Sequence, residues 1–481
     1  MKAGTVISIS AIALATTGSQ IIDEPQWSEK VRVVLDNTKE LKYDRGDRLP
    51  LYLWPAIDPG VTDDKSAELL VNEFNKRGVG IVSTWKLKNV DMDISQVISV
   101  AKAQKKLGQR INIDATSILY GFYDGENSGH IDKNGKQFYD DSFGKDHKMG
   151  CPFTTDARKN DIRKRVEYFL KKYKDEGLEI GFIFADWEID GPIEVNNSWE
   201  SSKKCTRCLS HLGENFTFNE FRKTMREMRS YLQNYSYSSP VLSYFPDALV
   251  GNYAVYPNDG YRYWYDYFEF FTEIHPYKKD QRAIYREWYN DFPLTGYTFA
   301  MPVVYTWWKT FTWYDFKNTD YRWFYNMLLN ASNAGRSTPQ NIPIISFVHW
   351  HTIFDGSKPD PAILQMSKNA YQELLWHMLL RGTDTFFMWS GKDEFPDETK
   401  LVHEVYAAAQ EYGNFLEKGI PINFDVPDKP GTVISGLALD NQVLVRRTDF
   451  DGNDKPVKVM AGTKIVTVNS TPGKCNVLSL D

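Results

Sequence analysis

The stretch FIFADWEIDGP, residues 182–192, joins an apolar run of strand length to three acidic residues spaced two apart. Alternate residues of an extended strand point the same way, so Asp186 and Glu188 are expected to share one face. A buried strand that carries carboxylates out of the core is costly unless they are paired or face a solvated cleft. The stretch therefore predicts a strand that presents acids to a site. The alternative is a strand end whose acids cap the next helix.

Strand-like and helix-like segments alternate on both sides of this stretch. Apolar runs that read as strands are followed by amphipathic segments of helical period, several of them closed by Gly. The expected strands are residues 49–55, 79–85, 110–114, 182–185, 241–245, 298–305, 342–348 and 385–389. Eight such alternations predict an α/β fold, a closed parallel (β/α)8 TIM barrel. An open nucleotide-binding sheet is disfavoured because no G-x-G-x-x-G follows the first strand.

From about residue 419 the pattern changes to short alternating apolar runs broken by Asp-Gly, Pro-Gly and Asn-Asp turns. This punctuation is typical of antiparallel strands. The 481 residues are therefore expected to divide into three parts. These are a signal peptide at 1–19, the catalytic barrel at 20–418, and a small sandwich-like accessory β domain at 419–481.

The N-terminus has the layout of a short secretory signal peptide, with Met1-Lys2 followed by an apolar run at 6–15 that contains small residues. No other apolar run is long enough to span a bilayer. A secreted or periplasmic location without a membrane span is therefore expected. The net charge is −6, and no Lys/Arg block indicates a nucleic-acid partner or a membrane surface.

The chain has four cysteines, Cys151, Cys205, Cys208 and Cys475. Cys205 and Cys208 form a C-x-x-C pair that would be half of a zinc site, but no second C-x-x-C or H-x-x-x-H completes it. In an exported chain a disulfide is favoured, with local and long-range pairings both open. The sequence thus predicts no metal and no cofactor.

Aromatic residues stand at nearly every predicted strand end, where a barrel of this type carries its chemistry. Pyranose rings stack on aromatic planes, and sugar hydroxyls need acceptors such as Asp and Glu, so aromatics around acids indicate a carbohydrate substrate. The alternative is that each aromatic only fills the barrel mouth. The expected substrate-binding residues are Trp54, Trp85, Asp190, Tyr244, Trp307, His349, Trp350 and Trp389.

Other chemistries have little support in the sequence. His349 and His351 would point to one face of a strand, as metal ligands do, but no spacing nominates a third ligand. They are expected to hydrogen-bond substrate or neighbouring acids. No G-x-S-x-G elbow and no P-loop is present.

The predicted seventh strand ends Ser346-Phe347-Val348-His349-Trp350-His351 without an acid, although many barrel glycosidases carry a Glu there. The nucleophile must then come from elsewhere in the chain or from the substrate. Substrate assistance needs only one D-x-E, because the 2-acetamido oxygen of the sugar attacks the anomeric carbon. Two adjacent carboxylates also push their pKa values apart, so that one stays protonated as the acid.

The run from Asp186 to Pro192 resembles the D-W-E-x-x-x-P signature of the hyaluronidase family, whose D-x-E logic chitinase-like enzymes share. Three shorter matches follow in the family's order across about two hundred residues. Phe245-Pro246-Asp247 is similar to its fifth-strand F-P-D, Val304-Tyr305 to its sixth-strand V-Y, and Phe387–Gly391 to its eighth-strand L-W-G. The upstream chitinase aspartates are absent, and Phe184 stands where one would fall.

The resemblance implies a (β/α)8 hydrolase in which Glu188 is the general acid/base and Asp186 orients the acetamido nitrogen. It further implies that Tyr305 hydrogen-bonds the acetamido group, that Trp389 forms the floor of the sugar subsite, and that Asp247 belongs to the catalytic set. The chain departs from the family pattern at Ser243, where the family has tyrosine, and its cysteine framework is not reproduced. These departures indicate distant kinship or convergence.

Two other interpretations remain open. One pairs Glu188 or Asp186 with a second acid, Asp114, Asp247 or Asp393, in a two-carboxylate mechanism on a neutral or sulfated polysaccharide such as a galactan. The other is an inactive barrel that only binds sugar, and the presence of both acids argues against it.

Overall fold

The computed structural model describes residues 27–54, 61, 63–87, 90–119, 128–140, 148, 150–154, 156–187, 198–258, 292–354, 358–391 and 393–480. The expected signal peptide at 1–19 and two predicted site residues, Glu188 and Asp190, lie outside these ranges. Among the helices that are described, none combines the length and apolar character that crossing a membrane requires.

Parallel strands form the centre of the molecule in two hydrogen-bonded sheets, β2-β1-β11-β10-β9 and β3-β4-β7-β8. The strands β2 and β3 are two halves of the second barrel strand, separated at Ile81. The Thr298 amide donates to the Val250 carbonyl at 2.9 Å and links the fifth strand to the start of the sixth. In order these strands are β1 (Leu51–Trp54), β2 (Val79–Gly80), β3 (Val82–Thr84), β4 (Ile111–Asp114), β7 (Ile180–Ala185), β8 (Leu249–Asn252), β9 (Val303–Trp307), β10 (Ile345–Ile353) and β11 (Thr385–Trp389). The predicted α/β barrel is confirmed.

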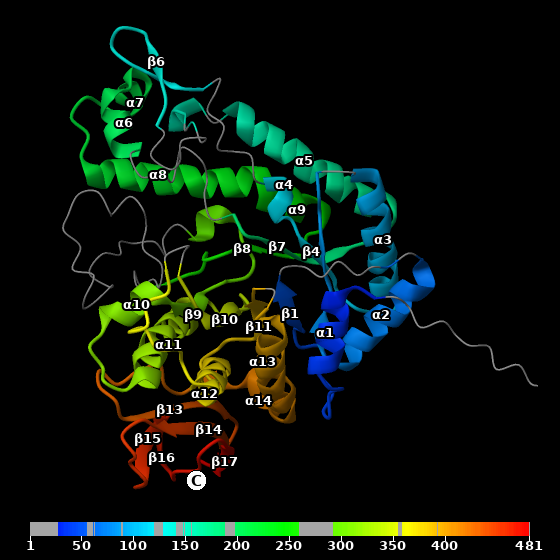
Figure 1. Cartoon of the computed structure of the whole chain (residues 1–481), viewed down its shortest axis with the longest axis vertical. Helices are drawn as coiled ribbons and strands as arrows, with labels where there is room; N and C mark the ends of the chain where they lie inside the picture. Colours follow the sequence, from blue (N-terminus) through cyan, green and yellow to red (C-terminus); the bar gives the residue numbers. More distant parts are fainter. Residues whose placement is uncertain are drawn as a thin grey trace, which may run out of the picture.

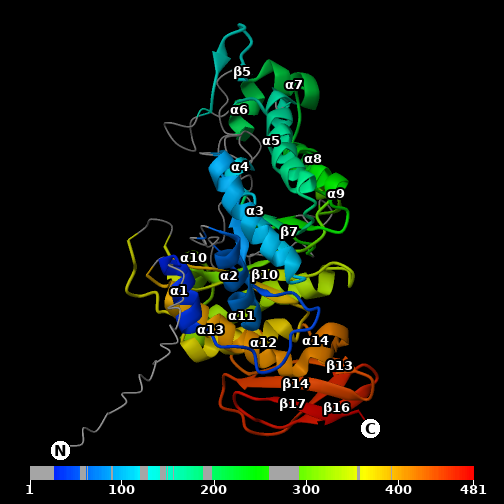
Figure 2. The same cartoon turned by 90° about the vertical axis from the view of Figure 1, so that its right-hand side faces the viewer.

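Helices cover the outside of the barrel, as Figures 1 and 2 show. Side-chain caps begin several of them: Asp63 accepts from the Ser66 amide, Ser367 accepts from the Ala370 amide, and Thr217 and Glu220 form a reciprocal capping box. The longer helices are α1 (Glu29–Asn37), α2 (Asp64–Lys76), α3 (Val90–Lys106), α5 (Asp156–Asp175), α8 (Phe218–Gln233), α11 (Thr319–Ser337), α12 (Lys368–Leu379) and α13 (Phe395–Ala409). Shorter elements are α4 (Thr116–Leu119), α6 (Ser198–Lys204), α7 (Thr206–Leu212), α9 (Ser239–Tyr244), α10 (Trp308–Trp313), α14 (Gly413–Lys418), β5 (His130–Ile131) and β6 (Gln137–Phe138).

Aromatic rings fill the barrel interior. Tyr52 of β1 stacks on Phe182 of β7 with ring centroids 4.2 Å apart, and Phe184 packs on Phe387 of β11 at 4.4 Å. Phe347 of β10 stacks on Phe387 as well, at 5.9 Å. Because these rings come from strands around the whole barrel, its centre is a packed core and not a pore.

The prediction that residues 241–245 form the fifth strand is wrong. Residues 241–244 belong to helix α9 and Phe245 is its C-cap; α9 continues α8 through one π-helical turn at Asn234–Ser238, and the fifth strand is β8. The apolar run at 241–245 was too short for its period to distinguish a strand from a helix, and Pro240 fits the first turn of α9.

This shift moves two predicted site residues to the opposite end of the barrel. Tyr244 and Asp247 precede β8 and line a hollow with Arg110 and Ile180, at the amino ends of β4 and β7. The predictions that Tyr244 binds substrate and that Asp247 is catalytic are therefore wrong, because the chemistry of such a barrel lies at the carboxyl ends.

The C-terminal strands form an antiparallel sheet that packs on α12, at the end of the molecule farthest from α7 in Figure 1. Buried Arg381 joins the two parts, because its guanidinium donates to Ser435 and to Ser332, each at 2.7 Å. Glu373 of α12 pairs with Arg446 at 2.6 Å. The strands are β12 (Ile420–Pro421), β13 (Thr432–Leu439), β14 (Gln442–Asp449) and β17 (Cys475–Ser479), with the hairpin β15 (Val457–Ala461) and β16 (Lys464–Val468) beside them.

Candidate active site

Strand alternation directs Asp186 toward the barrel axis. Phe182 and Phe184 belong to the interior core, whereas Ile183 and Trp187 lie in the separate apolar cluster under the helices. Asp186 follows Phe184 by two residues and so shares the inner face, at the carboxyl end of β7. Glu188, two residues further on, falls outside the described residues, and its predicted role stays a prediction.

Two neighbouring strand ends hold the backbone of this segment. The Asp186 amide donates to the Thr116 hydroxyl at 2.8 Å, just beyond β4. On the other side Asn252, at the end of β8, accepts from the Trp187 amide at 2.8 Å and donates to the Trp187 carbonyl at 3.2 Å. Asn252 thus fixes the backbone between the two predicted catalytic acids, a role that sequence reasoning missed because Asn252 lies outside the expected fifth strand.

Replacing Asn252 with Ala is expected to lower kcat about 10-fold to 100-fold with little change in KM, because a small displacement of catalytic groups is costly. The variant should also lose about 1–3 kcal/mol of stability, since both Trp187 backbone groups become unpaired. Asn112→Ala is the matched control: Asn112 is also buried and donates to a backbone carbonyl, of Ile81 at 3.0 Å, deeper in the barrel. Equal kcat losses in the two variants would refute a positioning role for Asn252.

Four aromatic side chains meet at the mouth of the barrel: two are the last residues of β1 and β11, and two are paired residues within β9 and β10. The Trp389 ring lies against the His349 ring, with centroids 4.5 Å apart. The ring centroids of Tyr305 and Trp54 lie 6.3 and 6.5 Å from that of Trp389. The Tyr305 hydroxyl hydrogen-bonds the hydroxyl of Tyr253, the residue after β8, at 2.7 Å. The structure therefore brings together Trp54, Tyr305, His349 and Trp389, as expected from the sequence.

Asp114 anchors this aromatic group. Its carboxylate accepts from the Trp54 indole at 3.2 Å, from the Thr84 hydroxyl at 3.4 Å and from the Thr116 amide at 2.9 Å. Burial raises the pKa of Asp114, and these hydrogen bonds oppose the rise. With three donors in place, Asp114 is suited to orienting Trp54.

Glu398 of α13 accepts hydrogen bonds from residues of β10. Its fully buried carboxylate accepts from the backbone amides of Trp350 and His351 at 3.0 and 2.9 Å. The imidazoles of His349 and His351 both present Nδ1 to the same oxygen, at 2.9 and 2.7 Å. Burial acts to raise the pKa of Glu398, but the hydrogen bonds from His349 and His351 outweigh it and leave that pKa below its usual value. Both histidines therefore contact a neighbouring acid, one of the two roles expected for them from the sequence.

Glu394 is a carboxylate near this group that the sequence analysis did not nominate. Its Oε2 lies 3.9 Å from His349 Nε2, and its side chain is 40% exposed. It follows Asp393, which was considered as a second acid. The signal in the sequence was weak, because Glu394 stands five residues past the end of β11.

Three predicted substrate-binding tryptophans are buried by packing. Trp85 stacks on Phe169 of α5 at 4.9 Å, and the Trp350 indole donates to the Met366 carbonyl at 2.9 Å, so both face the helices and these two predictions are wrong. Trp307 is 1% exposed and packs edge-on against Trp313 of α10 at 6.1 Å. Both faces of a parallel barrel strand are apolar, so the sequence pattern does not show which face an aromatic takes.

The four cysteines are free, contrary to the expected disulfide. Cys475 lies in β17, and the other three are buried beside one another. The group formed by Cys151, Cys205, Cys208 and His130 is the one place among the described residues where His, Cys, Asp or Glu side chains gather closely enough to hold a metal ion.

No model of a known protein family matches the sequence, and no curated protein matches it. Among solved structures, the chain is similar to α-L-fucosidase isoenzyme 2 from Paenibacillus thiaminolyticus, with 10% identity, 78% of this chain and 51% of that chain covered, and a TM-score of 0.42. It is also similar to bee venom hyaluronidase, with 14% identity, 56% of this chain and 81% of that chain covered, and a TM-score of 0.33. A third similar structure is the β-galactosidase of the Antarctic haloarchaeon Halorubrum lacusprofundi, with 10% identity, 77% of this chain and 59% of that chain covered, and a TM-score of 0.45. This chain spans about half the length of the fucosidase. At such TM-scores these likenesses do not bear on function, which rests on the residues at the barrel mouth.

Proposed function

We propose that this protein is a glycoside hydrolase that cleaves a polysaccharide or glycosaminoglycan built from 2-acetamido sugars. The observation that carries the proposal is that Asp186 shares the inner face of β7 at the end of the barrel where Trp54, Tyr305 and Trp389 meet. A carboxylate at the same end of the barrel as an aromatic group suits the two needs of a sugar site, an acceptor for polar groups and a plane for stacking. Secretion through the segment 1–19 belongs to the proposal.

In this mechanism Glu188 donates its proton to the glycosidic oxygen as the leaving group departs. The acetamido oxygen of the same sugar attacks the anomeric carbon, and Asp186 stabilises the positive charge that develops on the acetamido nitrogen. Tyr305 donates a hydrogen bond to the acetamido group, with its own hydroxyl positioned by Tyr253. Water then opens the cyclic intermediate with Glu188 acting as base, which returns the enzyme to its starting protonation state.

A matched pair of substrates tests the proposal. N-acetylated chitin oligomers and hyaluronan are expected to release reducing ends, whereas chitosan oligomers of equal length are expected to be inert. The two oligomers differ only in the acetyl group, which supplies the internal nucleophile. Cleavage of chitosan, dextran or galactan at comparable rates would exclude substrate assistance.

The position of Glu394 supports one alternative. This partly exposed carboxylate near His349 is suited to act with Asp186 or Glu188 in a two-carboxylate mechanism on a neutral or sulfated polysaccharide such as a galactan. Glu394→Gln distinguishes the two mechanisms: it should abolish turnover under the alternative and leave kcat within a few-fold under substrate assistance.

A further inference from the structure

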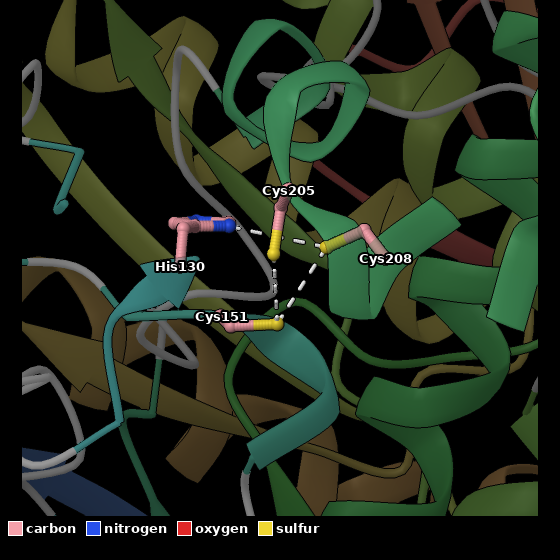
Figure 3. A group of neighbouring side chains, drawn as sticks. All are labelled: His130, Cys151, Cys205 and Cys208. Atoms are coloured by element: carbon pink, nitrogen blue, oxygen red, sulfur yellow. Dashed lines mark hydrogen bonds between the residues drawn. The ribbon is translucent and has the colours of Figure 1, made fainter. Parts of the chain in front are cut away.

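We propose that Cys151, Cys205, Cys208 and His130 form a structural Zn²⁺ site. Figure 3 shows the four side chains pointing toward one another from β5, from the residue before Pro152 and from the start of α7. All four are buried, and their ligand atoms lie within 4.8 Å of one another. The C-x-x-C pair thus gains a third and a fourth ligand from Cys151 and His130, which stand 54 and 75 positions before Cys205 in the chain.

The separations match those of a tetrahedral zinc site. With Zn–S bonds of about 2.3 Å and a Zn–N bond of about 2.0–2.1 Å, neighbouring sulfurs should lie about 3.8 Å apart and sulfur and nitrogen about 3.6 Å apart. In the protein, Cys151 Sγ lies 3.6 Å from Cys208 Sγ and 3.8 Å from Cys205 Sγ, and His130 Nδ1 lies 3.9 Å from Cys208 Sγ. Three of the six separations thus lie within about 0.3 Å of the tetrahedral values, and the other three are at most 4.8 Å.

A disulfide explains the same residues less well. Bonded sulfurs lie about 2.05 Å apart, whereas these pairs are much wider. A disulfide between any two of the three cysteines would also not explain why the third thiol and the His130 imidazole are buried beside it. Three thiols and one imidazole are the ligand set of a closed Cys₃His zinc site, in which no position is left for water or substrate.

Contacts around the four ligands hold them in place. The Ile131 amide donates to Cys205 Sγ at 3.5 Å, which is favourable for a thiolate. The His130 ring stacks on Phe138 with centroids 5.0 Å apart, so its orientation is fixed. The Cys151 amide donates to the Ser128 carbonyl at 2.7 Å, and Arg207, inside the C-x-x-C, donates to the Gly129 carbonyl at 3.0 Å.

The ion would join two loops that begin at acid-bearing strands. His130 and Cys151 lie between β4 and α5, and Cys205 and Cys208 lie between β7 and α8. These loops follow Asp114 and Asp186, respectively. Because every position around the ion is taken by protein, it would supply stability to this pair of loops and take no part in bond cleavage.

Metal analysis of the purified full-length protein tests the proposal directly. About one zinc per chain is expected, and replacement by Co²⁺ should give the intense visible bands and the near-ultraviolet thiolate charge-transfer band of a tetrahedral sulfur site. Cys208→Ser should lose most of the metal, whereas Cys475→Ser, which changes a cysteine of the C-terminal sheet, should keep it.

The outcome does not depend on any enzymatic activity, and wild-type protein alone can decide it. Wild-type protein expressed with zinc that contains less than a tenth of an ion per chain would overturn the proposal. A peptide linking Cys151 to Cys205 or Cys208 by a disulfide, found by mass spectrometry without reduction, would overturn it as well. Full zinc retention in Cys208→Ser would place the metal elsewhere and have the same consequence.

Discussion

Replacing Glu188 with Gln is expected to lower kcat about 10³-fold and to leave the Kd for a polysaccharide near its parental value. General acid catalysis typically contributes about 10²–10⁴-fold, and the amide keeps the shape of the acid while removing its transferable proton. Binding depends on the aromatic group and should persist. Reducing-sugar assays give kcat, and isothermal titration of the inactive variant gives Kd.

The control for this variant is Glu179→Gln. Glu179 is exposed and stands directly before β7, at the opposite end of the same strand. It should keep parental kcat and stability. Parental turnover in Glu188→Gln would show that Glu188 is not the acid, and a kcat loss shared with Glu179→Gln would show a general effect of the substitution.

Replacing Glu398 with Gln is expected to lower the free energy of unfolding by about 3–5 kcal/mol. The buried carboxylate is the common acceptor for two backbone amides and two imidazoles, whereas the amide of Gln offers this buried network one acceptor oxygen and no negative charge. Urea unfolding followed by tryptophan fluorescence measures the loss. The adjacent Asp397→Asn is the control, because its pair with Lys368 at 3.0 Å is exposed and should contribute at most about 1 kcal/mol. A loss no larger than that of the control would contradict this role for Glu398.

The same network predicts a pH dependence of stability. The pKa of Glu398 lies below its ordinary 4.5, and that of His351 lies above its ordinary 6.5 because Glu398 outweighs the effect of burial. The contribution of the Glu398–His351 pair to the free energy of unfolding should therefore be complete between pH 4.5 and pH 6.5, the ordinary pKa values of the two groups. It is lost as the pH falls through the folded pKa of Glu398 and as it rises through that of His351. In Glu398→Gln this part of the profile should become flat.

Much of the fold could be predicted because local patterns carry it. Strand β11 has the predicted bounds, since its apolar run is bracketed by Gly382 and by Ser390-Gly391. The fifth strand could not be predicted, because the run at 241–245 is too short for its pattern to distinguish a strand from a helix, and Pro240 suits a helix start as well as a strand boundary. That single error moved Tyr244 and Asp247 from the mouth of the barrel to its base.

The candidate site shows a similar division. Asp186 and Trp389 could be nominated from the sequence because an acid or an aromatic stands out at a strand end. Asn252 and Glu394 were missed, since neither stands in a recognisable motif and both act through neighbours from other strands. Cys151 and His130 were not joined to the C-x-x-C pair, because their spacing along the chain matches no metal-site pattern.

The sequence by itself determined the period of each element and hence the alternation of strands and helices, because hydrophobic periodicity depends on residues within a few positions. It also placed acids and aromatics at the strand ends. Only the tertiary structure decided that Trp54 and Trp389 face the axis while Trp85 and Trp350 face the helices, since both faces of these strands are buried and equally apolar. It also decided which distant side chains meet, because barrel closure and loop packing bring together residues that no local pattern connects.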